Sequence, residues 1–84
     1  MSITNRAINI CGMMLDARDA VRRLPSYKTS MPKVKATLRS YAEIEGVDLL
    51  DGMIVLVERS KENPTTIMWL LAAYAELAET GEAE

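Results

Sequence analysis

The residue types that could carry out catalysis are scarce in this sequence. Its 84 residues include no histidine and one cysteine, Cys11, which falls on the inner side of an expected helix and is therefore predicted to be a buried, inert thiol. Zinc sites and most nucleophilic sites depend on histidine or on several cysteines. The four glycines are widely spaced, and none precedes the Lys-Ser or Lys-Thr pair of a phosphate-binding loop. We therefore expect a protein that is not an enzyme and that uses no cofactor and no metal.

Two acidic pairs are the remaining candidates for chemistry, Glu43 with Glu45 and Asp48 with Asp51. Paired carboxylates can hold Mg²⁺ or act as general acid and base. Both pairs also fall near expected helix ends, so we interpret them as helix caps and solvated helix faces, with a magnesium site as the alternative. An enzyme built on these carboxylates would have to show metal-dependent activity.

Basic residues gather in one stretch of the chain, which the formal net charge of -2 conceals. Between Asp16 and Arg39, seven basic residues accompany two acids, whereas ten acids accompany two basic residues from residue 40 onward. Tyr27 lies within the basic stretch. We call these eight residues the basic cluster and predict that they bind a partner: Arg18, Arg22, Arg23, Tyr27, Lys28, Lys33, Lys35 and Arg39.

The basic cluster has three interpretations. Arg22 and Arg23 come at the end of an expected helix, where cations complement the helix dipole, so the cluster could be a solvated surface. Lys33 and Lys35 come at the start of the next helix, where the dipole gives no such reason, and this favours contact with an acidic protein or a neighbouring subunit. The same cations could instead hold nucleic acid or a nucleotide, with Tyr27 stacked on a base.

Four helices are predicted to position these residues, over about 3–24, 32–45, 48–61 and 64–80, followed by an acidic, frayed tail at 81–84. Pro25 ends the first helix and opens a predicted loop over residues 25–31. Asn63 before Pro64 is a strong start signal for the last helix. In the first helix, apolar residues recur at gaps of four and three, which is typical of a buried helix face. That face comprises Ile3, Ala7, Ile10, Met14, Ala17, Val21 and Leu24.

A second apolar line in the first helix, Ile8, Cys11 and Leu15, predicts that its first half is covered on two sides. Gly12 lies in the middle of this helix, where glycine costs roughly 1 kcal/mol relative to alanine. We interpret its presence as the sign of a close helix crossing at that turn.

Residues 53–57, Met-Ile-Val-Leu-Val, are the ambiguous segment, because a β-branched run of this length suits a buried strand as well as a buried helix. Asp48 is suitably placed as an N-cap, and the chain offers no second strand-like run to pair with. These observations favour a helix. A strand paired with another chain is the alternative.

Together these elements predict one all-α domain over residues 1–84, a small, mostly antiparallel four-helix bundle. The last two helices carry more apolar residues than one buried stripe needs, so a monomer would expose an apolar face. We expect this face to make a homo-oligomer. Its predicted interface residues are Ile54, Val57, Ile67, Met68, Leu71 and Tyr74.

Location and function follow from what the sequence contains and lacks. No apolar run approaches the roughly 18 residues of a membrane span, and no secretion signal is evident, so we expect a cytoplasmic protein without a membrane partner. The expected function is a non-enzymatic interaction module that binds a protein partner and inhibits or chaperones it, as small antagonists from phages and mobile elements do. The alternative is nucleotide or nucleic-acid binding through residues 18–39.

Overall fold

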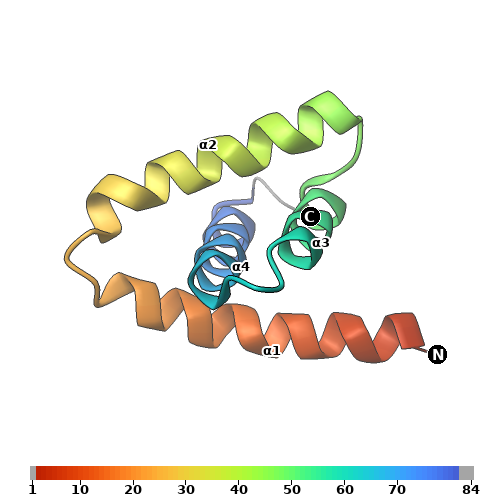
Figure 1. The fold of residues 1–84 in the computed structure, drawn as a ribbon, viewed down its shortest axis with the longest axis horizontal. Coiled ribbons are helices and arrows are strands. Elements are labelled where there is room, and N and C mark those ends of the chain that lie inside the picture. Colours follow the sequence, from red (N-terminus) through yellow and green to blue (C-terminus); the bar gives the residue numbers. More distant parts are fainter. Residues whose placement is uncertain (1, 82–84) are drawn as a thin grey trace.

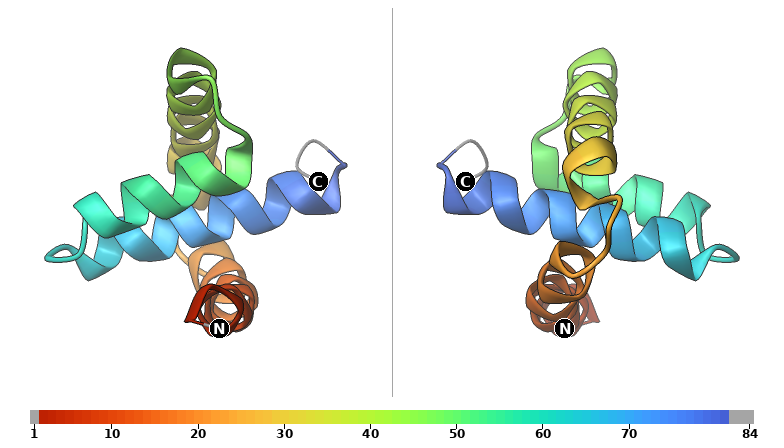
Figure 2. Two further views of the ribbon diagram at one scale, coloured as in Figure 1. Left: turned by 90° about the vertical axis from the view of Figure 1, so that its right-hand side faces the viewer. Right: turned by 90° about the vertical axis from the view of Figure 1, so that its left-hand side faces the viewer.

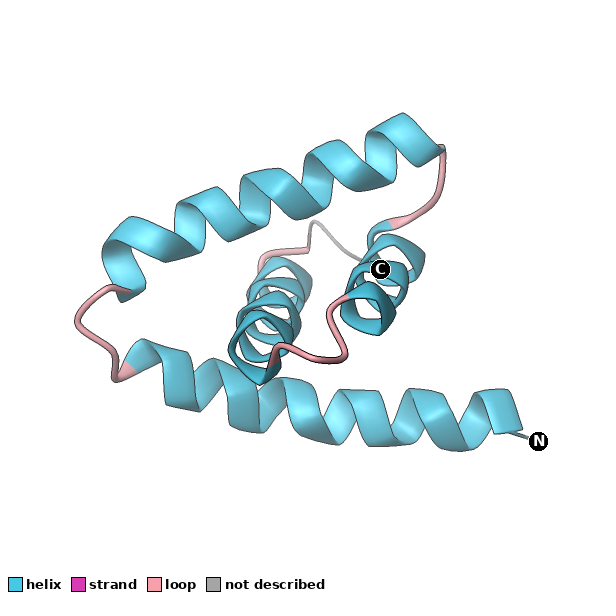
Figure 3. Ribbon diagram, viewed as in Figure 1, coloured by secondary structure: helices cyan, strands magenta, loops and turns pink. Residues whose placement is uncertain are grey.

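The computed structural model describes the backbone of residues 2–81 and the side chains of residues 12–81. This part of the chain forms four helices, α1 (Ser2–Arg22), α2 (Tyr27–Glu45), α3 (Leu49–Arg59) and α4 (Pro64–Glu79), and contains no strand (Figure 1, Figure 3). The predicted all-α class is therefore confirmed. Residues 53–57 lie inside α3, so the helical interpretation is correct and the strand alternative is wrong.

The fourth helix lies at the centre of the molecule. It packs against each of the other three helices, while α3 also packs against α2. The α3–α4 pair is seen end-on between α1 and α2 in Figure 1, and Figure 2 shows these two helices side by side and running in opposite directions. The chain is thus built from two helical hairpins, α1–α2 and α3–α4, which cross each other. The four helices therefore do not share one axis.

The sequence of α4 explains its central position. All residues from Leu70 to Leu77 are buried, so the helix has no solvated face over two turns. Three of these residues are alanines, whose small side chains allow neighbouring helices to approach closely on several sides. Its apolar side chains form the core together with Val21 of α1, Leu38 of α2 and Met53 of α3.

The apolar face predicted for α1 is present where its side chains are described. Met14, Ala17 and Val21 are buried against the rest of the core, whereas Leu24 lies in the turn after the helix and is 37% exposed. The other members of that predicted face, Ile3, Ala7 and Ile10, lie outside the described side chains.

The second covered side predicted for α1 is wrong where the structure describes it. Leu15 is 54% exposed, and a Cβ atom placed on Gly12 would meet no atom within 4 Å. Gly12 therefore does not mark a close helix crossing. The remaining members of that line, Ile8 and Cys11, lie outside the described side chains, and so does the predicted burial of Cys11.

The second helix begins at Tyr27, five residues before the predicted start at Pro32. Pro32 lies inside the helix, where its ring removes one backbone hydrogen bond near the N-terminal end. The extra turn is anchored because Met31 is buried and Tyr27 is half-buried against the core. The predicted loop over residues 25–31 is thereby reduced to a tight turn between Arg22 and Tyr27.

Helix ends elsewhere lie within one or two residues of the prediction. The side chain of Asp48 accepts a hydrogen bond from the backbone N–H of Asp51 at 2.8 Å, and that of Asn63 accepts one from Thr66 at 3.2 Å. Both residues therefore act as the N-caps that the sequence predicted. Gly46 ends α2 with a φ of 68°, in the left-handed region that favours glycine. Within the described residues, no helix is long and apolar enough to cross a membrane.

Helices α2 and α3 pack closely at Gly52, which gives the first testable prediction. A Cβ atom on Gly52 would lie 3.3 Å from Cβ of Ala42. The larger side chain of Gly52→Val would push the helices apart, and we expect it to lower the free energy of unfolding by about 2 kcal/mol. Gly12→Ala is the matched control, because it fills open space in a helix and should raise stability by about 0.5–1 kcal/mol. Urea denaturation followed by circular dichroism measures both, and equal effects would contradict the packing described.

Candidate functional site: a buried carboxylate within the basic cluster

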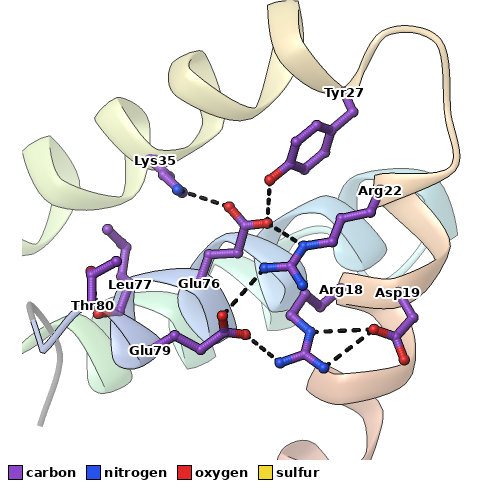
Figure 4. Close-up of polar contacts among 9 residues, drawn as sticks. All are labelled: Arg18, Asp19, Arg22, Tyr27, Lys35, Glu76, Leu77, Glu79 and Thr80. Carbon is purple, nitrogen blue, oxygen red and sulfur yellow. Dashed lines mark hydrogen bonds and ion pairs between the residues drawn. The ribbon is translucent and has the colours of Figure 1, made fainter.

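A buried carboxylate, Glu76, lies where α1, α2 and α4 meet. Its sequence neighbours on α4 are apolar, and the residue is 5% exposed. Three side chains donate to it, as Figure 4 shows. Lys35 Nζ lies 2.8 Å from Oε1, Arg22 Nε lies 2.9 Å from Oε2, and the Tyr27 hydroxyl also donates to Oε2. One carboxylate therefore ties α4 to both of the helices that cross it.

A second acid, Glu79, extends this network toward solvent. Its Oε2 accepts a hydrogen bond from Arg22 Nη2 at 3.3 Å, so Arg22 bridges the two glutamates. Its Oε1 pairs with Arg18 Nη1, and Arg18 also contacts its neighbour Asp19 at 3.2 Å. These pairs are more exposed than those of Glu76, so water and salt weaken them.

The titration of the network follows from these contacts. Burial raises the pKa of Glu76, but the hydrogen bonds from Lys35, Tyr27 and Arg22 outweigh that effect and lower the pKa to about 2. The hydrogen bond to Glu76 raises the pKa of Arg22 and that of Tyr27. The carboxylate is therefore ionised at neutral pH, and its charge is fully matched within the fold.

The structure divides the basic cluster into two groups. Arg18, Arg22, Tyr27 and Lys35 point at the acids of α4, so the fold itself uses them. The remaining four, which lie on exposed positions, are Arg23, Lys28, Lys33 and Arg39. A shallow groove on α2 lined by Tyr27, Lys28, Met31, Pro32, Lys35 and Arg39 brings part of both groups together.

Glu76 is the residue of this network that the sequence analysis missed. It is the only charged residue between Ile67 and Ala78, in a helix that is otherwise apolar. A lone acid in a buried helix needs a cationic partner, because an unpaired buried charge is very costly. That signal predicts an internal partner among the cations of the chain, although it does not say which ones.

The predicted oligomer interface is only partly available. Leu71 is 2% exposed and Tyr74 is 6% exposed, because α4 is central and both side chains fill the core of the chain itself. These two side chains are therefore covered within the single chain, and contact with a second copy stays a prediction. The other four, Ile54, Val57, Ile67 and Met68, are half-buried and pack against the core.

Two apolar grooves flank the first two turns of α4. The groove on the α1 side, about 370 Å³ in volume, is lined by Met13, Asp16, Ala17, Pro64, Ile67, Met68 and Leu71. The groove on the α2 side, about 360 Å³, is lined by Ser30, Val34, Thr37, Thr66, Trp69 and Leu70. The half-buried side chains of Met68 and Trp69 thus border one groove each, on a helix that is buried on all sides from Leu70 to Leu77.

Comparison with known protein families, curated proteins and solved structures finds no match to this chain. Among the described residues, no group of three or more histidine, cysteine, aspartate or glutamate side chains is arranged to hold a metal ion.

The role of Glu76 gives a second prediction. Glu76→Gln keeps the shape of the side chain but leaves Lys35 and Arg22 without their counter-charge. We expect the free energy of unfolding to fall by about 2–3 kcal/mol, because breaking a buried ion pair on one side leaves unmatched charge. Glu79→Gln is the matched control on the same helix and should cost much less, since its pairs are exposed. Chemical denaturation compares the two variants, and an equal loss in both would contradict a special role for Glu76.

The same carboxylate predicts how stability depends on pH. The pKa of Glu76 is about 2 in the folded chain and 4.5 ordinarily, so between these values the unfolded chain binds a proton that the folded chain does not. Stability is therefore full above pH 4.5 and falls as the pH is lowered toward 2, by about 3 kcal/mol from this group. Urea midpoints measured across this range should fall less steeply in Glu76→Gln than in the unchanged protein. Identical slopes would show that Glu76 does not cause the dependence.

Proposed function

We propose that this protein is a non-enzymatic interaction module that binds another protein and modulates it. The observation that carries the proposal is the surface of the first two turns of α4. Met68 and Trp69 are only partly buried there, each beside an apolar groove, whereas the residues that follow them in α4, from Leu70 to Leu77, are buried. An apolar surface retained in this way is typical of a protein contact site.

The chemistry of the α1–α4 groove indicates the kind of partner. Two helices form its walls, a geometry that suits an amphipathic helix of a partner laid into the groove. Met13 and Met68 border it, and flexible methionines adapt to an incoming apolar surface. Asp16 is the charged residue of its lining, so a basic residue beside the apolar stripe of the partner would be matched.

The ion pairs of the basic cluster also favour the apolar groove over the basic cluster as the site that binds the partner. Arg18, Arg22 and Lys35 are bonded to Glu76 and Glu79. An external acidic ligand would have to compete with these internal carboxylates. The apolar grooves involve no such competition.

Nucleotide or nucleic-acid binding is the second candidate, favoured by the groove on α2. Three cations, Lys28, Lys35 and Arg39, line it beside the ring of Tyr27. Phosphate binding there would use the charge of the cations and the stacking surface of the ring. Intact-mass measurement of captured complexes reports a bound nucleotide and a bound protein in the same experiment.

The test of the proposed function is affinity capture with two variants. Met68→Glu places a charge in the α1–α4 groove and should reduce capture of the partner at least about tenfold, because a desolvated charge opposes apolar docking. Val55→Glu is the matched control, since Val55 is an exposed apolar residue of α3 that lines neither groove. Quantitative mass spectrometry compares the captured proteins. A partner retained equally by both variants would contradict binding in this groove.

A further inference from the structure

The second helix carries opposite charges at its two ends. Arg23 and Lys28 lie at the α1–α2 turn, where α2 begins, and Glu43 and Glu45 lie in its last turn. Figure 1 shows the two turns on opposite sides of the molecule. A helix of 19 residues separates them by about 28 Å. The molecule therefore has a basic end and an acidic end.

Three of these charges, Lys28, Glu43 and Glu45, are placed unfavourably for the dipole of α2, whereas Arg23 follows the C-terminus of α1, where a cation is favourable. The N-terminus of a helix is electropositive and favours acids, and its C-terminus is electronegative and favours cations. α2 has no acid in its first turn and no basic residue in its last turn, and the Ser26 side chain makes no capping hydrogen bond. At each end of α2, the side-chain charge therefore has the same sign as the nearby end of the helix dipole, which destabilises the helix in an isolated chain.

The charges are also unmatched within the described part of the chain. Arg18, Arg22 and Lys35 are paired with acids of α4, but the structure gives no side-chain ion pair to Arg23 or Lys28. The same holds for Glu43 and Glu45 at the other end. The internal network therefore leaves these two ends uncompensated.

Each end combines its charge with exposed apolar side chains. At the acidic end, Ile44 stands between the two glutamates and is 79% exposed, and Val47 in the following turn is 40% exposed. At the basic end, Leu24 stands beside Arg23 and is 37% exposed. An apolar centre with a charged rim is the usual anatomy of a protein interface.

We infer that a second copy of this chain docks head to tail, with the α1–α2 turn of one molecule seated on the α2–α3 turn of the next. Leu24 then packs against Ile44 and Val47, while the basic rim faces the acidic rim and the positive end of one α2 faces the negative end of another. The contact is heterologous, because the two surfaces differ, so each added copy leaves a free end for the next. This contact lies outside the α4 grooves and is independent of the proposed function.

Two variants test the inference, each disabling one end. The tail-blocked variant alters the acidic end, at the α2–α3 turn, and carries Glu43→Gln, Ile44→Ser and Glu45→Gln. All three positions are exposed, and circular dichroism checks that helical content is kept.

The head-blocked variant alters the basic end, at the α1–α2 turn, and carries Arg23→Gln, Leu24→Ser and Lys28→Gln, which are likewise exposed positions. By sedimentation velocity, each variant alone should remain at the monomer mass of 9.3 kDa. An equal mixture of the two retains one intact contact and should form a two-chain complex and nothing larger. A mixture that stays monomeric, or either variant associating as the unchanged protein does, would overturn the inference.

The unchanged protein provides a test that needs no triple variant. Its average mass should rise with concentration at about 10 mM salt, where charges act over about 30 Å, and fall at about 1 M salt, where they act over about 3 Å. NMR signals of residues 23–28 and 43–48 should shift together on dilution. A constant monomer mass at low salt would overturn the inference. So would association abolished by Met68→Glu, which would place the contact in the α4 groove.

Discussion

The interaction on which the rest of the structure depends is the bonding of the Glu76 carboxylate to three side chains from two other helices. Arg22 comes from α1, and Tyr27 and Lys35 come from α2. These two helices pack extensively against α4 and far less against each other. One buried carboxylate therefore bonds the central helix to both α1 and α2 at the place where the three helices meet.

This arrangement also determines which surfaces of the described chain remain uncovered. The bonds to Glu76 and Glu79 neutralise the part of the basic cluster nearest α4. Two kinds of surface are left over: the apolar grooves beside the first turns of α4, and the charged, apolar-centred ends of α2. A chain of this size has a small core, so leaving such surfaces uncovered lowers its stability. A binding role would explain why these surfaces are kept despite that loss.

Much of the fold could be predicted from local signals in the sequence. The four helices, the caps at Asp48 and Asn63, and the buried line of Met14, Ala17 and Val21 all follow from spacing and from backbone chemistry. The early start of α2 at Tyr27 could not be predicted in this way, because the extra turn is held by tertiary contacts. Met31 is buried in the core and Tyr27 donates to Glu76, although the composition of residues 25–31 is loop-like. The crossing of the two hairpins could not be predicted either. It depends on how the surfaces of two helices pack together, and the spacing of apolar residues within one helix does not specify this.

The most direct test of the central claim is the pKa of Glu76, measured from its side-chain carboxyl ¹³C shift as the folded protein is titrated with acid. Burial and hydrogen bonding act on this pKa in opposite directions, so its value reports which of the two effects dominates. The structure predicts a midpoint of about 2, because Lys35, Tyr27 and Arg22 stabilise the charged form. A midpoint at or above the ordinary value of 4.5 would contradict the account, since it would show that the three bonds do not hold the carboxylate in solution.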